Sequence, residues 1–315
     1  MALLEVENLK LHYPVRGGMF APRRFVRAVD GVSFQLEAGE TIGLVGESGC
    51  GKSSLGRAVV RLETPTGGTI RVDGCDITAL SGGALRRQRK NFQMIFQDPY
   101  GSLNPRLTVF SSLDEVLALH SKLDRDGRRR RAGELLELVG LESDFMNRYP
   151  HQFSGGQRQR IGIARALAAE PKLIVADEPV SALDVSVQAQ IINLLEDIQN
   201  QTGTAFLFIA HDLAVVEHIS RRIMVMYLGR IVEEGPAAEV CGTPRHPYTK
   251  ALLSAVPRID GGGKRRIVLS GDVPSPLTPP DGCAFHPRCP LAKPECAAKR
   301  PELDGNTHKC ACFFA

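Results

Sequence analysis

The sequence contains no tryptophan and no apolar run near the roughly 20 residues that a membrane-spanning helix needs. Its strongest apolar stretch, TAFLFIA at residues 204–210, suits a buried strand. A composition of 43% hydrophobic and 23% charged residues is ordinary for a globular protein. We therefore expect a folded chain that does not cross a membrane, long enough at 315 residues for an α/β core and a small appended module.

A large excess of either charge is also missing, because 39 basic and 35 acidic side chains leave a formal net charge of +4. That balance argues against nucleic acid as a partner. The one run of like charge, RRRR at residues 128–131, precedes the helical pattern AGELLELVG. A solvated helix start is the favoured interpretation of this run, ahead of a phosphate-binding patch.

A secretory signal is absent from the start of the chain, MALLEVENLK, which carries Glu5 and Glu7 where basic residues belong and has no long apolar segment. We expect the chain to stay in the cytosol. Because cytosolic thiols are normally kept reduced, disulfides among the eight cysteines are not expected.

A glycine-rich segment joins an apolar run to a helical pattern in TIGLVGESGCGKSSLGRAVVRL, residues 41–62. Gly46, Gly51, Lys52 and Ser53 meet the phosphate-loop pattern G-x-x-x-x-G-K-[ST] in the strand, loop and helix context that it requires. Glycines let backbone N–H groups point at a polyphosphate, and the helix presents its positive dipole end. We expect Lys52 to neutralise the β and γ phosphates and Ser53 to bind Mg²⁺, and we disfavour a turn without a ligand.

Two adjacent carboxylates end the apolar run KLIVADEP at residues 172–179, as in a parallel strand buried on both faces that ends at the ligand edge of a sheet. Asp177 is expected to face Mg²⁺ through water. Glu178 is the natural base or orienting group for the water that attacks the γ phosphate. A helix cap would explain one acid, but not both acids together with a phosphate loop.

A second anion site is predicted in QFSGGQRQRIGIARALAAEP, residues 152–171, where Ser154 caps a helix whose first turn holds Gly155 and Gly156. A single polyphosphate does not need two anion-binding sites from the same chain. The segment resembles the signature of ABC-type ATPases, in which this helix end contacts the γ phosphate of ATP bound to the partner subunit.

The resemblance covers residues 1–255, with the motifs in family order, and it implies an α/β P-loop fold of ABC type. That fold has a β-rich N-terminal part and an inserted helical subdomain at about residues 98–170. Tyr13 resembles the residue that stacks on adenine, Gln97 the Q-loop glutamine that senses Mg²⁺, and His211 the switch histidine. SALD at 181–184 resembles the D-loop at the dimer seam. The resemblance implies catalytic roles for Glu178, His211, Lys52 and Gln97, a Mg²⁺ site at Ser53, Gln97 and Asp177, and ATP contacts by Tyr13, Gly46, Glu47, Ser48, Gly49, Cys50, Gly51, Lys52, Ser53, Ser54, Gln97, Asp177, Ser154, Gly155, Gly156, Gln157 and Asp184.

Each motif occurs once, so a complete site needs two chains. HPYTKALLSAVP at 246–257 and FQDPYGSLNPRLTV at 96–109 resemble the ATP-binding subunits of dipeptide and oligopeptide ABC importers. The inserted segment around residues 19–27 resembles the subunit that pairs with a non-identical ATPase, which favours a heterodimer. This resemblance implies two transmembrane permease subunits, an extracytoplasmic peptide-binding protein and a peripheral location on the cytoplasmic face of the inner membrane. Nickel or glutathione importers, and an ATPase that serves a soluble enzyme complex, are the alternatives.

A linker composition after residue 257 leads into a cysteine-rich extension, residues 256–315, with too few apolar residues for a core of its own. Such small modules usually need a disulfide, a bound metal or another cross-link for stability. The C-x5-C and C-x6-C spacings of Cys283, Cys289 and Cys296 are wider than zinc knuckles and suit an iron–sulfur cube better. The tail of peptide-importer ATPases, some of which hold a four-iron cluster, is similar and implies Cys312 as the fourth ligand. Zinc, uncoordinated thiols and an exchange of Cys310 for Cys312 remain alternatives, while Cys50, Cys75 and Cys241 are expected to be small buried side chains.

Overall fold

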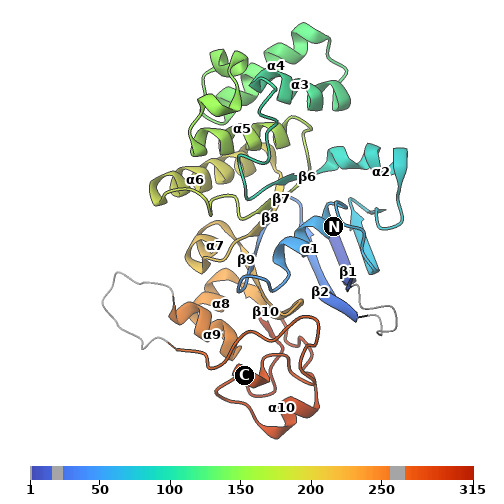
Figure 1. Ribbon diagram of the computed structural model, residues 1–315, viewed down its shortest axis with the longest axis vertical. Coiled ribbons are helices and arrows are strands. Elements are labelled where there is room, and N and C mark those ends of the chain that lie inside the picture. The colour runs from blue at the N-terminus through green and yellow to red at the C-terminus, as the bar shows by residue number, and fades with distance from the viewer. Residues whose placement is uncertain (1, 16–23, 256–266) are drawn as a thin grey trace.

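The computed structural model describes residues 2–15, 24–255 and 267–315. Residues 16–23, which include the first part of the insertion predicted around residues 19–27, and residues 256–266, which include the first part of the predicted linker, lie outside the described residues. Figure 1 shows a helical part at one end of the molecule, sheets in the middle and the C-terminal segment, residues 267–315, at the opposite end.

The main sheet has seven strands in the order β11-β10-β9-β3-β8-β7-β6. The strands from β9 to β6 run parallel, and β10 and β11 add an antiparallel edge. The predicted apolar runs form its centre, because every residue of β3, β7 and β8 is buried. The bounds are β3 Thr41–Val45, β6 Phe92–Ile95, β7 Leu173–Asp177, β8 Ala205–Ile209, β9 Arg222–Tyr227, β10 Arg230–Pro236 and β11 Lys309–Cys310.

A second, antiparallel sheet forms the β-rich N-terminal part that was predicted. Its order is β2-β1-β4-β5, with bounds β1 Ala2–Val15, β2 Arg24–Glu37, β4 Gly67–Val72 and β5 Cys75–Asp76. The end of β2 alternates buried and exposed residues, since only one face of this sheet is covered. Its apolar face shares a core with helix α1, Lys52–Val59, and with one face of the main sheet.

The helical subdomain lies between β6 and β7, as predicted, and contains no strand in residues 96–172, all of which the structure describes. Its helices are α3 Val109–His120, α4 Arg125–Leu138 and α5 Gly155–Leu167, with short turns η2 Ser143–Asn147 and η3 Pro150–Gln152. Thr108, Asp124 and Ser154 cap the three helices with their side-chain oxygens. The arginine run 128–131 lies within the first turns of α4, where Arg128 pairs with Asp114 and Arg131 with Glu134.

The remaining helices connect strands of the sheets. They are α2 Gly82–Gln88, η1 Arg89–Asn91, α6 Val185–Thr202, α7 Leu213–Ile219, α8 Ala237–Gly242 and α9 Pro247–Ser254. Helix α9 begins with Pro247 in its first turn, as expected from HPYTKALLSAVP, and His246 caps it.

The C-terminal segment shares the core of the α/β part. Phe285 is 1% exposed, and its ring packs against Tyr227 and Tyr248 with centroids 5.3 and 5.5 Å away. Strand β11 pairs with β10, and Ala311 donates a backbone hydrogen bond to Val232. Two short helical pieces, η4 His286–Arg288 and α10 Pro294–Ala298, complete the segment. The C-terminal segment, which was expected to have too few apolar residues for a core of its own, therefore packs its apolar residues against the edge of the main sheet.

Candidate functional site

The phosphate loop connects β3 to α1 and wraps tightly around the first turn of the helix. Gly51 has a φ of 108°, and a Cβ atom there would lie 2.0 Å from the carbonyl oxygen of Ala28. Both the left-handed backbone and the close approach require glycine. The loop glycine thus lets β2 and the loop touch backbone to backbone.

The lysine of the loop is 4% exposed and lies across the loop itself. Its Nζ donates to the carbonyl oxygens of Gly46 at 2.8 Å and Glu47 at 3.1 Å. These contacts hold the ammonium group of Lys52 at the centre of the loop, where the N-terminus of α1 also adds positive potential. The arrangement is suited to a polyphosphate.

Two of the three side chains predicted to bind Mg²⁺, Ser53 and Asp177, lie together although they come from different motifs. Ser53 Oγ donates to Asp177 Oδ1 at 2.7 Å, although 124 residues separate them. Burial raises the pKa of Asp177, while the hydrogen bond from Ser53 opposes the shift. A hydroxyl oxygen and a carboxylate oxygen are the donors that Mg²⁺ prefers, so this pair fits the ion.

Three predicted catalytic residues converge at the carboxyl ends of neighbouring parallel strands. Gln97 follows β6, Glu178 follows β7 and His211 follows β8. Gln97 Nε2 donates to Glu178 Oε2 at 3.0 Å, and His211 Nδ1 lies 3.6 Å from the same oxygen. Glu178 is thus the shared contact of the other two side chains.

A cavity of about 350 Å³ lies beside the phosphate loop, Gln97 and Glu178. Tyr13, residues 48–54, Gln97 and Glu178 line it, whereas Gly46, Glu47, Asp177 and His211, also predicted at the site, do not. Sequence reasoning missed the lining residues Val26, Arg27, Ala28, Leu228, Gly229 and Pro276. Pro276 comes from the C-terminal segment, where no local motif signals a nucleotide contact, and its carbonyl accepts a hydrogen bond from Arg27 N.

The signature segment is separate from this cavity. Ser154 Oγ accepts from Gln157 N at 3.3 Å, and Gln157 Oε1 accepts from Ser154 N at 3.0 Å, which forms a capping box. Gly156 packs on α6, because a Cβ atom there would lie 2.5 Å from Val187. Gly155, Gly156 and the rest of residues 154–157 are not among the residues that line the cavity.

Asp184, predicted at the dimer seam, is the N-cap of α6 and accepts hydrogen bonds from Val187 N and Ser186 Oγ. These bonds lower the pKa of Asp184. Exposed Val185, 82% accessible, follows it directly. The predicted contacts with a partner's nucleotide therefore lie on the surface of this chain, away from its own phosphate loop.

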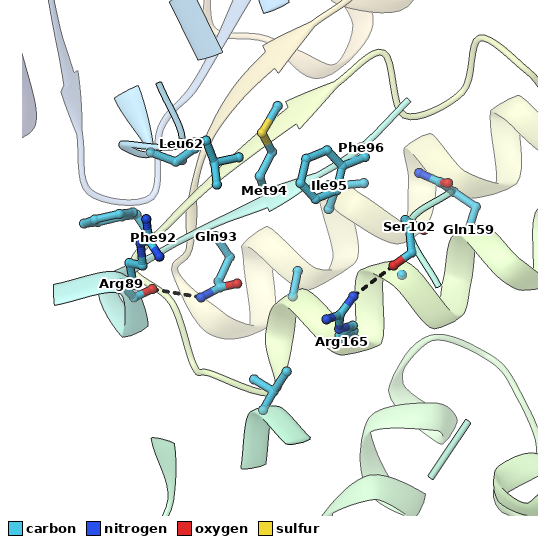
Figure 2. Close-up of a pocket in the computed structure, with 14 residues that line it drawn as sticks. Leu62, Arg89, Phe92, Gln93, Met94, Ile95, Phe96, Ser102, Gln159 and Arg165 are labelled. Carbon is cyan, nitrogen blue, oxygen red and sulfur yellow. Dashed lines mark hydrogen bonds between the residues drawn. The ribbon is translucent and has the colours of Figure 1, made fainter. Parts of the chain in front are cut away.

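A second cavity, of about 200 Å³, lies between β6 and α5 (Figure 2). Its lining includes the exposed apolar side chains of Leu62 and Phe96, together with Gln93 and Gln159. Arg165 donates to the carbonyl oxygen of Ser102 across its wall. Phe96 immediately precedes Gln97, so this pocket adjoins in sequence the glutamine that contacts Glu178.

The four cysteines predicted as ligands, Cys283, Cys289, Cys296 and Cys312, line one small cavity under Phe285. None forms a disulfide. Cys310 does not line this cavity and instead pairs along β10 opposite Glu233. Within the described residues, no group of three or more His, Cys, Asp or Glu side chains has an arrangement that could hold a metal ion. The structure therefore does not show the predicted iron–sulfur or zinc site, although the four thiols share one cavity.

The other predicted thiols are partly as expected, since Cys50 and Cys241 are buried whereas Cys75 is half-buried.

No helix in the described part of the chain is long and apolar enough to span a bilayer.

Comparison with known proteins agrees with the geometry of the site. The family model described as ABC transporter matches residues 29–181, and the model described as oligopeptide/dipeptide transporter, C-terminal region, matches residues 232–296. Among solved structures, a dimeric ATP-binding cassette, MJ0796, bound to ADP and Pi has a TM-score of 0.66 and 30% identity. It covers 74% of this chain and 98% of its own.

Curated relatives match along nearly their whole length. The dipeptide transport ATP-binding protein DppF of Escherichia coli strain K12 is 52% identical over 99% of this chain and 94% of its own. The oligopeptide transport ATP-binding protein AppF of Bacillus subtilis strain 168 is 54% identical over 99% of this chain and 97% of its own. With its phosphate loop, strand-end carboxylates and C-terminal region in one chain, this protein belongs to the ABC-type ATPases, in the group of ATP-binding proteins of dipeptide and oligopeptide transporters.

Proposed function

We propose that this chain hydrolyses ATP to power the import of dipeptides or oligopeptides through membrane permease subunits. The observation that carries the proposal is the presence, in one chain, of the Ser53–Asp177 and Gln97–Glu178 pairs together with the C-terminal region of peptide transporters. Transport proteins at least 50% identical over nearly their full length support the choice of peptides as substrates.

Hydrolysis uses the side chains around the 350 Å³ cavity. The loop N–H groups and Lys52 bind the β and γ phosphates, and Tyr13 stacks on adenine. Ser53, Asp177 and Gln97 would hold Mg²⁺, which would neutralise charge on the phosphate oxygens. Glu178 accepts a proton from water as the water oxygen bonds to the γ phosphorus, the bond to the ADP oxygen breaks, and phosphate leaves. His211 is positioned against Glu178 and contacts the γ phosphate.

Two chains complete each site. Residues 154–157 of one chain contact the γ phosphate held by the phosphate loop of the other, and Asp184 lies at the dimer seam beside that nucleotide. The separation of α5's start from the cavity of its own chain supports this arrangement. ATP then closes the dimer and hydrolysis releases it. We propose that the second subunit of the dimer is usually a similar but non-identical ATPase.

Closure acts on the permeases through the pocket between β6 and α5 (Figure 2). Its floor belongs to the main sheet and one wall to the helical subdomain, so movement of the subdomain changes its shape. Exposed Phe96 and Leu62, 40% and 50% accessible, supply the apolar contact for a permease segment. The chain thereby lies on the cytoplasmic face of the inner membrane as a peripheral subunit, and an extracytoplasmic binding protein delivers the peptide.

The C-terminal cysteines are proposed to hold a structural [4Fe–4S] cluster through Cys283, Cys289, Cys296 and Cys312. The support is that these four thiols line one cavity, whereas Cys310 lies along β10. Iron and sulfide are measured in anaerobically purified protein. Four irons per chain, lost in Cys312→Ser but kept in Cys310→Ser, are expected; stoichiometric zinc without sulfide contradicts the cluster.

The function itself is tested by reconstituting the chain with its permeases, its mate ATPase and the binding protein encoded beside it in proteoliposomes. ATP-dependent uptake of labelled di- and oligopeptides is expected, and Glu178→Gln abolishes it. Uptake of nickel or of glutathione without peptide uptake contradicts the peptide assignment. Failure to associate with membranes when all neighbouring genes are expressed contradicts the transporter assignment.

A further inference from the structure

The C-terminal segment reaches the phosphate loop through a charged pair. Arg288 Nη1 and Nη2 donate to the two carboxylate oxygens of Glu47 at 2.7 and 3.1 Å. The Arg288 side chain is 8% exposed and that of Glu47 is 27% exposed. The hydrogen bonds that Arg288 donates to Glu47 raise the pKa of Arg288 above its ordinary value. Two parallel charge-assisted bonds fix both the position and the orientation of the carboxylate.

A second contact holds the backbone of the same residue. The hydroxyl oxygen of Tyr248, in α9, accepts a hydrogen bond from Glu47 N at 2.7 Å. Tyr248 is fully buried, and its ring packs against Tyr227 with centroids 4.8 Å apart. The hydroxyl group is therefore presented from a rigid aromatic cluster.

Arg288 is fixed to that cluster as well. Its N–H donates to the carbonyl oxygen of Phe285 at 3.0 Å, and Phe285 packs on both Tyr227 and Tyr248. Glu47 is thus held at its side chain and at its N–H by groups on one support, 201 and 241 residues away in sequence.

Glu47 is also a contact of the residues that meet phosphate. Its carbonyl oxygen accepts from Lys52 Nζ at 3.1 Å and from Cys50 N at 3.3 Å. A shift of Glu47 would therefore move the lysine and the following N–H groups. A loop held in its binding conformation before the ligand arrives loses less entropy on binding, which raises affinity.

We infer that Arg288 and Tyr248 are positioning residues that hold the phosphate loop through Glu47, so that helix α9 and the C-terminal segment together set the affinity of this chain for ATP. The inference rests on the nucleotide site of the proposed function. It assigns the segment a role in nucleotide binding, in addition to its packing against the main sheet.

The test measures the dissociation constant of a non-hydrolysable ATP analogue with Mg²⁺ for the full-length chain, and KM and kcat for ATP in the reconstituted transporter. Arg288→Met is expected to raise the dissociation constant and KM about tenfold, since a hydrogen bond to a charged group contributes about 1.4 kcal/mol or more. Tyr248→Phe keeps the ring and is expected to raise both about threefold. In each variant kcat at saturating ATP stays within about twofold of wild type, because the groups that touch the γ phosphate are unchanged.

Matched variants separate positioning from stability. Arg300→Met removes an exposed arginine of the same segment that donates to Gly282 and not to the loop, and it is expected to bind the analogue like wild type. Arg288→Lys keeps the charge without the two parallel bonds and is expected to restore part of the affinity. Glu47→Gln combined with Arg288→Met is expected to be little weaker than Arg288→Met alone, because both changes remove one pair.

Unchanged analogue affinity in Arg288→Lys and Tyr248→Phe, with thermal midpoints showing folded protein, overturns the inference and leaves the proposed function intact. A fall in kcat at unchanged KM overturns it as well. A wild-type chain that fails to bind the analogue overturns the proposed function and the inference together.

Discussion

The side-chain amide of Gln97 donates a hydrogen bond to Glu178, with 3.0 Å between Nε2 and Oε2, although 81 residues separate the two in sequence. They meet because β6 and β7 are parallel neighbours whose carboxyl ends share one edge of the sheet. In the sequence, the helical subdomain lies between these two strands. The bond therefore links Glu178 directly to the residue that precedes that subdomain.

Replacement of Glu178 by glutamine is expected to leave ATP binding intact and to lower turnover by about 10²-fold or more, since an amide cannot accept the proton from water. ATP should then accumulate in a closed dimer. Phosphate release and the ATP-dependent change in molecular mass measure the two effects. Glu217→Gln, an exposed acid of α7, serves as the control. Wild-type turnover in Glu178→Gln would show that another group orients the water.

Replacement of Lys52 by alanine is expected to remove nucleotide binding, because the polyphosphate loses its main counter-charge and the loop loses the bonds to Gly46 and Glu47. Titration with a fluorescent ATP analogue measures the loss. Lys172→Ala, which removes an exposed lysine paired with Asp73, should bind normally. Comparable affinities in the two variants would contradict the role of Lys52.

Ser154→Ala tests whether the signature segment acts on ATP bound to the other chain and not on ATP bound to its own phosphate loop. The loss of the helix cap is expected to cost about 1 kcal/mol of stability, while the affinity of the single chain for ATP stays unchanged because Ser154 does not line its cavity. Hydrolysis by the assembled dimer is expected to fall. Thr108→Ala removes an equivalent cap from α3 and should leave hydrolysis near wild type. If the isolated Ser154→Ala chain binds ATP more weakly than wild type, the signature segment contacts the nucleotide of its own chain, which contradicts the prediction.

Phe285→Ala tests whether the C-terminal segment is part of the main core. Phe285 is 1% exposed against Tyr227 and Tyr248, so its truncation is expected to cost about 3–5 kcal/mol. Urea unfolding of the full-length chain measures the difference, with exposed Phe313→Ala as the comparison. A loss below about 1 kcal/mol would mean that the segment contributes little to stability.

Acid is expected to weaken the fold through His246. Burial lowers the pKa of His246 to about 4, against about 6.5 in an unfolded chain. Between these values the unfolded state binds more protons, so stability is lost as the pH falls, by about 2 kcal/mol from pH 7 to 5. His246→Asn keeps an oxygen that can cap α9 and removes the titration.

Unfolding in urea at pH 7 and pH 5 should show a smaller pH dependence in His246→Asn than in the wild type. His218→Asn changes an exposed histidine and should keep the wild-type dependence. Equal slopes for the wild type and His246→Asn would show that the buried imidazole is not the group that titrates.

The sequence alone determined the residues with local signatures. The phosphate loop, the acidic strand end and the capped signature helix were predictable, because each combines residue types that the local backbone conformation requires with a fixed short spacing. Buried strands β3, β7 and β8 followed from continuous apolar runs. Gln97 and His211 have no such local signature, and only their order relative to the other motifs indicated them.

Tertiary structure decided the contacts between segments far apart in sequence. Pro276 at the nucleotide cavity, and Arg288 and Tyr248 on Glu47, have no pattern that pairs them with the phosphate loop. The antiparallel strands β10 and β11 bring them there by extending the sheet to the C-terminal segment. Such contacts depend on where the chain returns in space, which is set by burial of Phe285 and its neighbours and leaves no local spacing in the sequence.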